Sequence, residues 1–78
     1  ALFVNGSTGN IGIGENNPTV SLEVNGADAI KIPNGTSAER PTPEFGMIRY
    51  NSDIGRGEMY FNDVDGDGTQ GDAGWRPI

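Results

Sequence analysis

A near-repeat in the first half of the sequence constrains the fold more than any other feature. The run Leu-Phe-Val-Asn-Gly at residues 2–6 returns at 22–26 as Leu-Glu-Val-Asn-Gly, and Asn-Ile-Gly-Ile-Gly at 10–14 is echoed by Ala-Ile-Lys-Ile-Pro at 29–33. Each copy predicts a short apolar strand, an Asn-Gly turn and a second strand, the pattern of a hairpin with a two-residue turn. Since a single unit of this size cannot bury its own apolar face, we expect stacking and additional burial from other chains.

The composition leaves few other means of stabilising so small a domain. The 78 residues include no cysteine and no histidine, which excludes a disulfide and a Cys/His zinc site. Thirteen glycines and five prolines favour short strands joined by turns, and hence an all-β fold. Because a core in this size range contributes only about 3 to 5 kcal/mol, oligomerisation, a hard cation held by oxygen ligands, or both are expected.

The charge pattern excludes several classes of partner. The formal net charge is −6, and the five basic residues are separated along the chain, so we expect no binding to nucleic acid and no attraction to an anionic membrane. No apolar run has the length of a membrane span, so membrane insertion is not expected either. The sequence opens on Ala1 in the middle of a strand pattern, which indicates a piece of a longer protein.

Residues 1–33 form the repeated hairpin segment, in which apolar residues alternate with small or polar ones. This period of two indicates one buried and one solvated face. We expect the following residues to form a core shared between chains: Ile11, Ile13, Leu22, Val24, Ile30 and Ile32. Gly12 and Gly14 indicate either the close approach of neighbouring backbones or a loose loop.

Residues 34–44 are expected to connect the two halves, either as a plain linker or as a rigid connector that wraps a neighbouring chain. The pattern at residues 36–39 fits a capping box, but Pro41 and Pro43 end any helix within about a turn. The segment is therefore either extended, in the manner of polyproline, or a single helical turn.

Residues 45–78 predict a β-meander of three strands, near 46–51, 58–62 and 75–78. Its aromatic residues Tyr50, Tyr60 and Trp75 predict either packing between neighbouring strands or an exposed aromatic surface that could hold a sugar.

An acidic loop at residues 62–74 is the one segment whose pattern predicts chemistry. Asp63, Asp65 and Asp67 occupy positions 1, 3 and 5 of a calcium loop, and Thr69 offers a backbone carbonyl at position 7. Position 12 lacks the bidentate glutamate and no helices flank the loop, so an EF-hand is excluded, although Asp72 could supply a late ligand. The loop is either a Ca²⁺ site formed by these residues or a solvated hairpin loop.

Catalytic patterns are absent from the sequence. There is no histidine or cysteine, no Gly-x-Ser-x-Gly motif and no phosphate-binding glycine loop, and no acidic residue lies in an apolar run that would raise its pKa. We therefore expect a protein that is not an enzyme and has no catalytic residues.

Several segments together resemble a known family. These segments are similar to parts of bacteriophage tail fibres and related virion proteins, particularly those of marine phages that infect cyanobacteria. They are Asn-Ile-Gly-Ile-Gly before Pro18, the pair Arg40-Pro41, the run Gly-Met-Ile-Arg-Tyr-Asn at 46–51, Glu-Met-Tyr at 58–60 and Trp75. The resemblance covers nearly the whole chain, although the loop at 62–74 is much longer here than the family's usual Asp-Gly-Ser turn.

The resemblance implies a fibrous, intertwined homotrimer with a shaft like a β-prism or triple β-helix and a small C-terminal meander. It further implies a location on a virion tail appendage, outside the host cell. The expected partners are other fibre or tail proteins and a host-surface glycan. The expected function is a structural segment of a viral fibre that contributes to host attachment. The alternative is a calcium- or carbohydrate-binding module of an extracellular or cell-surface filament protein.

Overall fold

The computed structural model describes residues 2–68 and 70–78, which divide into two compact units, Ala1–Ile30 and Lys31–Ile78. We call them unit 1 and unit 2. The fold is all-β, as predicted, and consists of two small mixed sheets with no α-helix in the described part of the chain. No described helix has the length and apolar character that crossing a membrane requires.

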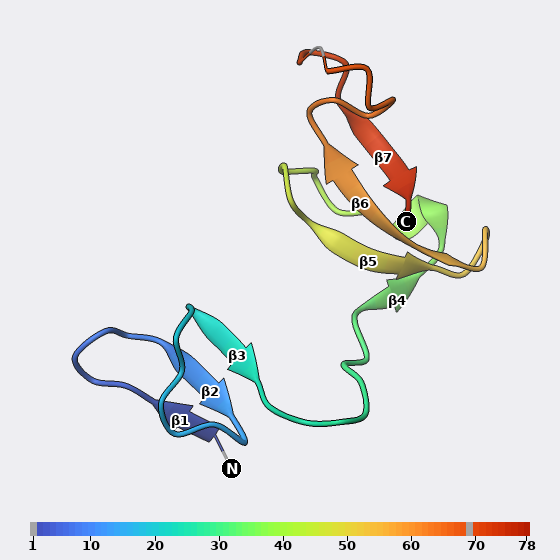
Figure 1. The fold of residues 1–78 in the computed structure, drawn as a ribbon. Helices are drawn as coiled ribbons and strands as arrows, with labels where there is room; N and C mark the ends of the chain where they lie inside the picture. Colours follow the sequence, from blue (N-terminus) through green and yellow to red (C-terminus); the bar gives the residue numbers. More distant parts are fainter. Residues whose placement is uncertain (1, 69) are drawn as a thin grey trace. The chain divides into compact units, whose positions relative to one another are not determined.

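Unit 1 is a sheet of three short strands in the order β1-β2-β3 (Figure 1). The strands are β1 (Leu2–Val4), β2 (Ile11–Ile13) and β3 (Leu22–Val24). The first two are antiparallel, so the first predicted hairpin is confirmed, whereas β3 lies parallel to β2 on its other side.

The predicted two-residue turn of this hairpin is wrong. A loop at residues 5–10 joins β1 to β2, and it is closed by the bond from Asn5 N–H to the carbonyl of Asn10 at 2.9 Å. The side chain of Asn5 accepts the N–H groups of Ser7 and Thr8 and so forms an Asx turn, while Gly9 takes the left-handed conformation with φ of +77°. The hydrogen bonds accepted by the Asn5 side chain therefore favour a longer turn than the two-residue turn predicted from the Asn-Gly pair.

The second predicted hairpin does not form. Its first strand is β3, but residues 29–32 adopt no strand. Instead, β3 pairs with the free edge of β2, and the bonds from Ile11 N–H to Ser21 and from Asn25 N–H to Ile13 flank the pairing at 2.8 and 2.9 Å. An isolated two-stranded hairpin is marginal in water, so a third strand on an existing sheet is the more stable arrangement.

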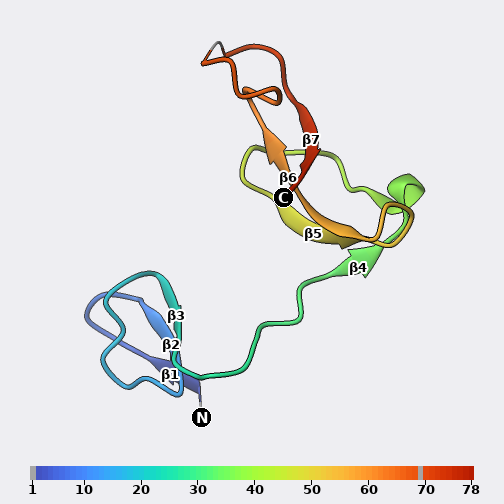
Figure 2. The same ribbon diagram turned by 45° about the vertical axis from the view of Figure 1, so that its right-hand side comes forward.

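Unit 2 is a four-stranded sheet in the order β4-β5-β6-β7, seen from two directions in Figures 1 and 2. Its strands are β4 (Asn34–Gly35), β5 (Ile48–Asn51), β6 (Arg56–Phe61) and β7 (Gly74–Pro77). The last three are antiparallel neighbours, which confirms the predicted meander. The two-residue strand β4 adds to its edge, parallel to β5.

The segment predicted as a connector contributes structure to unit 2. Besides β4, it contains the 3₁₀ turn η1 (Ser37–Glu39), so the structure selects the helical turn over the extended alternative for these residues. The carboxylate of Glu39 accepts the N–H of Thr36 at 2.8 Å and its hydroxyl at 3.2 Å, the reciprocal half of a capping box. These bonds lower the pKa of Glu39, the backbone bond most strongly.

Candidate functional site

The apolar side chains of unit 1 lie together on one face of its sheet. Residues two apart in a strand share a face, and so do directly paired residues on neighbouring strands. The register pairs Leu2 with Ile13 and Ile13 with Val24, and it pairs Val4 with Ile11 and Ile11 with Leu22. Three strands therefore contribute two apolar side chains each to a single surface, which we call the six-residue apolar face.

This surface is not covered by unit 1 itself. Leu2 is 69% exposed, and Val4 and Leu22 are both 58% exposed. Of the six residues, Ile11 alone is half-buried. Indeed, apart from Pro18, no aliphatic or aromatic side chain in residues 2–68 and 70–78 is buried. Unit 1 therefore leaves its apolar face open to a partner outside the unit.

The opposite face of the same sheet is covered by the chain's own backbone. Gly12 is buried there, and a Cβ on it would lie 2.0 Å from the carbonyl oxygen of Glu15, in the loop that links β2 to β3. Pro18 of this loop is also buried, and its carbonyl accepts the side-chain amide of Asn10 at 3.2 Å. The glycine in β2 thus admits a crossing segment of the same chain.

Four of the six predicted core residues belong to the six-residue apolar face: Ile11, Ile13, Leu22 and Val24. Of the other two, Ile30 lies outside the strands and is 63% exposed, and Ile32 belongs to unit 2. Sequence reasoning missed Leu2 and Val4, although the same period-two alternation marks them. Gly14, with φ of +70°, approaches the carbonyl of Asn25 within the chain.

A buried charged cluster occupies the covered face of the sheet in unit 2. The carboxylate of Glu58 is fully buried and accepts Arg40 Nη2 at 2.7 Å, Arg40 Nε at 3.1 Å, Arg49 Nη1 at 2.7 Å and Asn51 Nδ2 at 3.2 Å. These bonds, that from Arg40 most strongly, lower the pKa of Glu58 to about 2 although burial opposes the shift. We call Arg40, Arg49, Asn51 and Glu58 the Glu58 cluster.

The Glu58 cluster fastens the turn at residues 36–40 onto the sheet. Arg49 Nη2 donates to the carbonyl of Thr36 at 2.9 Å, and Asn51 Nδ2 donates to Ser37 Oγ at 2.9 Å. Each oxygen of the Glu58 carboxylate accepts two hydrogen bonds from donors of the same chain, which leaves no acceptor position for a ligand. The role of this carboxylate is therefore structural. Period-two alternation places Arg49 and Asn51 on one face, but it gives no sign that Glu58 of the next strand lies opposite Arg49.

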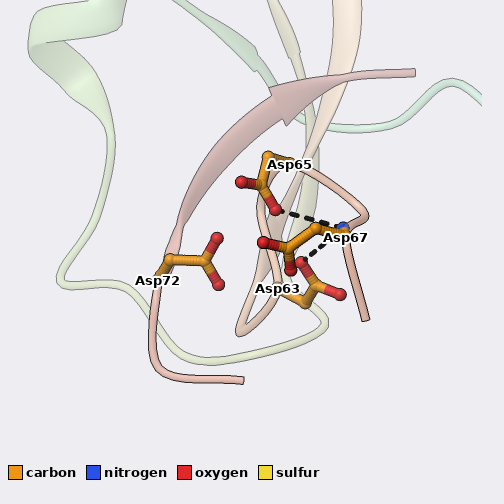
Figure 3. Close-up of side chains that lie close together, drawn as sticks. All are labelled: Asp63, Asp65, Asp67 and Asp72. Carbon is orange, nitrogen blue, oxygen red and sulfur yellow. Dashed lines mark hydrogen bonds between the residues drawn. The ribbon is translucent and has the colours of Figure 1, made fainter. Parts of the chain in front are cut away.

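The acidic loop brings four carboxylates together (Figure 3). Asp63, Asp65, Asp67 and Asp72 each offer an oxygen, and these oxygens all lie within 4.8 Å of one another. Asp72 joins the others through its bridge to Asp63 and through the bond from Val64 N–H to its carbonyl at 3.1 Å. Thr69, the fifth predicted ligand, lies outside the described residues.

Backbone bonds shape the acidic loop. The carboxylate of Asp63 accepts the N–H groups of Gly66, Asp67 and Gly68 at 3.0, 3.2 and 2.7 Å, and that of Asp65 accepts the N–H of Asp67 at 3.1 Å. Gly66 and Gly68 have φ of +73° and +87°, which lets the loop curl around these side chains. Asp72 Oδ1 is buried and has no hydrogen-bond partner among the described residues.

The protonation of the loop reflects this crowding. Desolvation opposes a low pKa at Asp63, but the backbone N–H groups, that of Gly68 foremost, lower it overall. The N–H of Asp67 lowers the pKa of Asp65, but desolvation and the neighbouring carboxyls of Asp72 and Asp63 raise it above its ordinary value. Oxygen ligands from alternate aspartates are the donor set that a hard cation such as Ca²⁺ accepts, and its charge would relieve their repulsion.

The three predicted aromatic residues do not share one surface. Tyr60 and Trp75 are paired across β6 and β7 and pack edge to face at 5.4 Å, whereas Tyr50 points to the other face of the sheet. The guanidinium of Arg40 lies 5.6 Å from the centre of the Trp75 ring. A groove of about 460 Å³ lies beside Trp75, and Glu39 and Arg49 provide polar groups along it.

Comparison of the chain with models of protein families, with curated proteins and with solved structures finds no match.

Proposed function

We propose that this chain is a non-enzymatic structural segment of a homotrimeric viral fibre, in which the six-residue apolar faces of three copies cover one another. The observation that carries the proposal is that all six side chains lie on one uncovered face of unit 1. Burial of aliphatic surface contributes most of the favourable free energy of association. Other copies of the same chain carry the same apolar face and can bury it.

The size of unit 1 supports the same proposal. It spans Ala1–Ile30, and chains below about 40 residues need disulfides, metals or oligomerisation to fold. The sequence has no cysteine, and the acidic loop belongs to unit 2. Association with other copies is therefore the means of stabilising unit 1 that we propose.

The number of copies and the place on a virion rest on the sequence resemblance to bacteriophage tail fibres. That resemblance supports a tail appendage outside the host cell, with other fibre proteins as neighbours and a role in host attachment. A host-surface glycan is a further proposed partner, for which the groove beside Trp75 offers an aromatic ring and polar side chains.

The mass of the chain in solution tests the proposal. Native mass spectrometry and sedimentation equilibrium should give a trimer for the wild type, and a monomer for Leu22→Asp, because a charge at this exposed strand position would be desolvated in the shared core. Val20→Asp is the matched control, since Val20 is similarly exposed at 55% but lies outside the strands, and this variant should remain trimeric. A monomeric wild type, or a trimeric Leu22→Asp variant, contradicts the proposed packing.

A second candidate function is calcium binding by the acidic loop. Four converging carboxylates and the unpartnered Oδ1 of Asp72 favour it. Calorimetric titration of the chain with Ca²⁺ should show one site with a dissociation constant on the order of 10⁻⁴ to 10⁻³ M, as in extracellular modules. Asp65→Asn should abolish the signal, whereas Asp28→Asn, a change at an exposed acid of unit 1, should leave it intact. Absence of heat with the wild type would end this candidate.

A further inference from the structure

Unit 2 also has an apolar sheet face that unit 2 itself does not cover. Ile48 and Tyr50 alternate along β5, and Met59 and Phe61 alternate along β6, with Ile48 paired directly with Met59. These four side chains therefore share one face, which we call the β5–β6 apolar stripe. Ile48 is 44% exposed, Tyr50 is 37% exposed, and Met59 and Phe61 are half-buried.

The β5–β6 apolar stripe is opposite the face that holds the Glu58 cluster. Residues 36–40 cover that other face through the bonds of Arg40, Arg49 and Asn51. The sheet of unit 2 thus buries the polar side chains of Arg49, Asn51 and Glu58 on its covered face, whereas Ile48 and Tyr50 on the other face remain exposed, an unusual arrangement in a soluble domain. An apolar surface on a sheet of this kind marks an interaction site.

The distribution of acids points to the partner. Each copy has a net charge of −6, so two copies repel each other wherever their acidic side chains meet. Glu23 in β3 and Glu58 in β6 both point to the covered face of their sheets. The strand residues on the uncovered faces include no acid in either unit, and in unit 2 they include Arg76, which is paired with Met59. These two faces are therefore where copies of an acidic chain can approach.

The area that a trimer needs also points to a second copy. The largest apolar patch on a typical monomer measures on the order of 300–600 Å². A specific interface buries about 800 Å² on each partner, and each chain of a trimer has two neighbours, so about 1,600 Å² is needed from every chain. A single patch of typical size does not supply this area, so a trimer requires further contact surface on each chain. Of the other exposed apolar residues in the described chain, Phe3 of β1 is 37% exposed on the opposite face of the unit 1 sheet, and the rest lie outside the strands, except for Ile48 and Tyr50 of the β5–β6 apolar stripe.

From these observations we infer that the β5–β6 apolar stripe is a second contact surface between copies of this chain. The inference rests on the proposed self-assembly and adds unit 2 to it. In the assembly, Ile48, Tyr50, Met59 and Phe61 pack against a neighbouring copy, while the opposite face remains covered by the chain's own residues 36–40.

Oxidation of the two methionines tests the inference without altering the stripe. Met59 lies on the stripe, whereas Met47 precedes β5 and borders the groove beside Trp75, so Met47 is an internal control. Assembled wild type and dissociated Leu22→Asp chains are treated with hydrogen peroxide, and the oxidation of each methionine is followed by mass spectrometry. Met59 should oxidise at least about 10-fold more slowly in the assembly, with Met47 changed less than about twofold. Equal rates for Met59 in both states overturn the inference.

A pair of matched variants provides the second measurement. Ile48 and Ile54 are both 44% exposed, but Ile54 lies in the turn between β5 and β6, away from the stripe. Ile48→Asp should raise the dissociation constant of the full chain's assembly about 100-fold, and Ile54→Asp by less than about threefold. Emission of the single tryptophan, Trp75, verifies that unit 2 remains folded in both variants.

The results separate the two proposals. If Leu22→Asp dissociates the trimer but Ile48→Asp does not, and Met59 is not protected, the stripe is not a contact and the proposed function stands. If the wild type is a monomer, both proposals fail. If Leu22→Asp stays trimeric while Ile48→Asp dissociates it, the stripe is a contact and the proposed packing of unit 1 is wrong.

Discussion

Unit 1 and unit 2 each cover one face of a small sheet, but they do so with different groups. In unit 1 the cover is a backbone crossing, which fits because Gly12 has no side chain. In unit 2 the cover is the turn at 36–40, which two arginines and an asparagine fasten to the buried carboxylate of Glu58. In both units the covered face holds the buried strand residues, Gly12 in unit 1 and Arg49, Asn51 and Glu58 in unit 2, whereas the six-residue apolar face and the β5–β6 apolar stripe remain partly exposed.

The strongest test of this comparison removes the centre of the Glu58 cluster. Glu58→Ala leaves Arg49 buried without its carboxylate, and breaking a buried ion pair in this way should destabilise unit 2 by about 3 to 5 kcal/mol. Urea unfolding followed by the emission of Trp75 measures the effect, because this single tryptophan lies beside Arg40 in unit 2.

The matched control for this variant is Glu39→Ala, which removes an exposed carboxylate of the same segment and should lower the urea midpoint far less than Glu58→Ala does. Equal losses in the two variants would show that the Glu58 cluster does not hold the turn onto the sheet.

Acid should weaken unit 2 through the same carboxylate. The folded pKa of Glu58 is about 2, below its ordinary value of 4.5, so its stabilising effect is complete above about pH 4.5 and is lost as the pH falls towards 2. The urea midpoint reported by Trp75 should decline across this window. In Glu58→Gln, which cannot titrate at this position, the decline should be shallower, and an unchanged slope would assign the acid sensitivity to other carboxylates.

The smallest effect is expected where backbone packing covers unit 1. Gly12→Ala would place Cβ against the carbonyl of Glu15, so the backbone must shift at a cost of about 1 to 3 kcal/mol. Hydrogen exchange at Ile11 N–H, which bonds the carbonyl of Ser21, should accelerate accordingly.

Gly6→Ala is the control for the Gly12 variant, because a Cβ at Gly6 has no described atom within 4 Å and should change stability by less than about 0.5 kcal/mol. If the two alanine variants exchange alike, the crossing segment does not seal unit 1.

Local pattern predicted the all-β class, the first hairpin, the meander and four members of the six-residue apolar face. These succeeded because alternation along a strand is a property of neighbouring residues, and Ile11 and Ile13 share a face whatever lies beside them. The prediction of a two-residue turn failed because the side chain of Asn5 offers the backbone a competing set of bonds. The convergence of Asp63, Asp65 and Asp67 was also foreseeable, since their spacing places them in one tight loop.

The sequence by itself determined which residues alternate, where glycine permits a turn or a crossing, and that no disulfide could stabilise the chain. Only the tertiary structure decided that β3 pairs in parallel with β2, and that Arg40 reaches Glu58 from eighteen positions away. Pairing between distant segments depends on which strand edge and which sheet face remain available after the local turns have formed. The alternation of apolar and polar residues along one strand does not determine which strand pairs with it. For the same reason, the period-two pattern identifies which apolar residues share a face, but only the folded chain shows that the six-residue apolar face and the β5–β6 apolar stripe are not the faces that it covers.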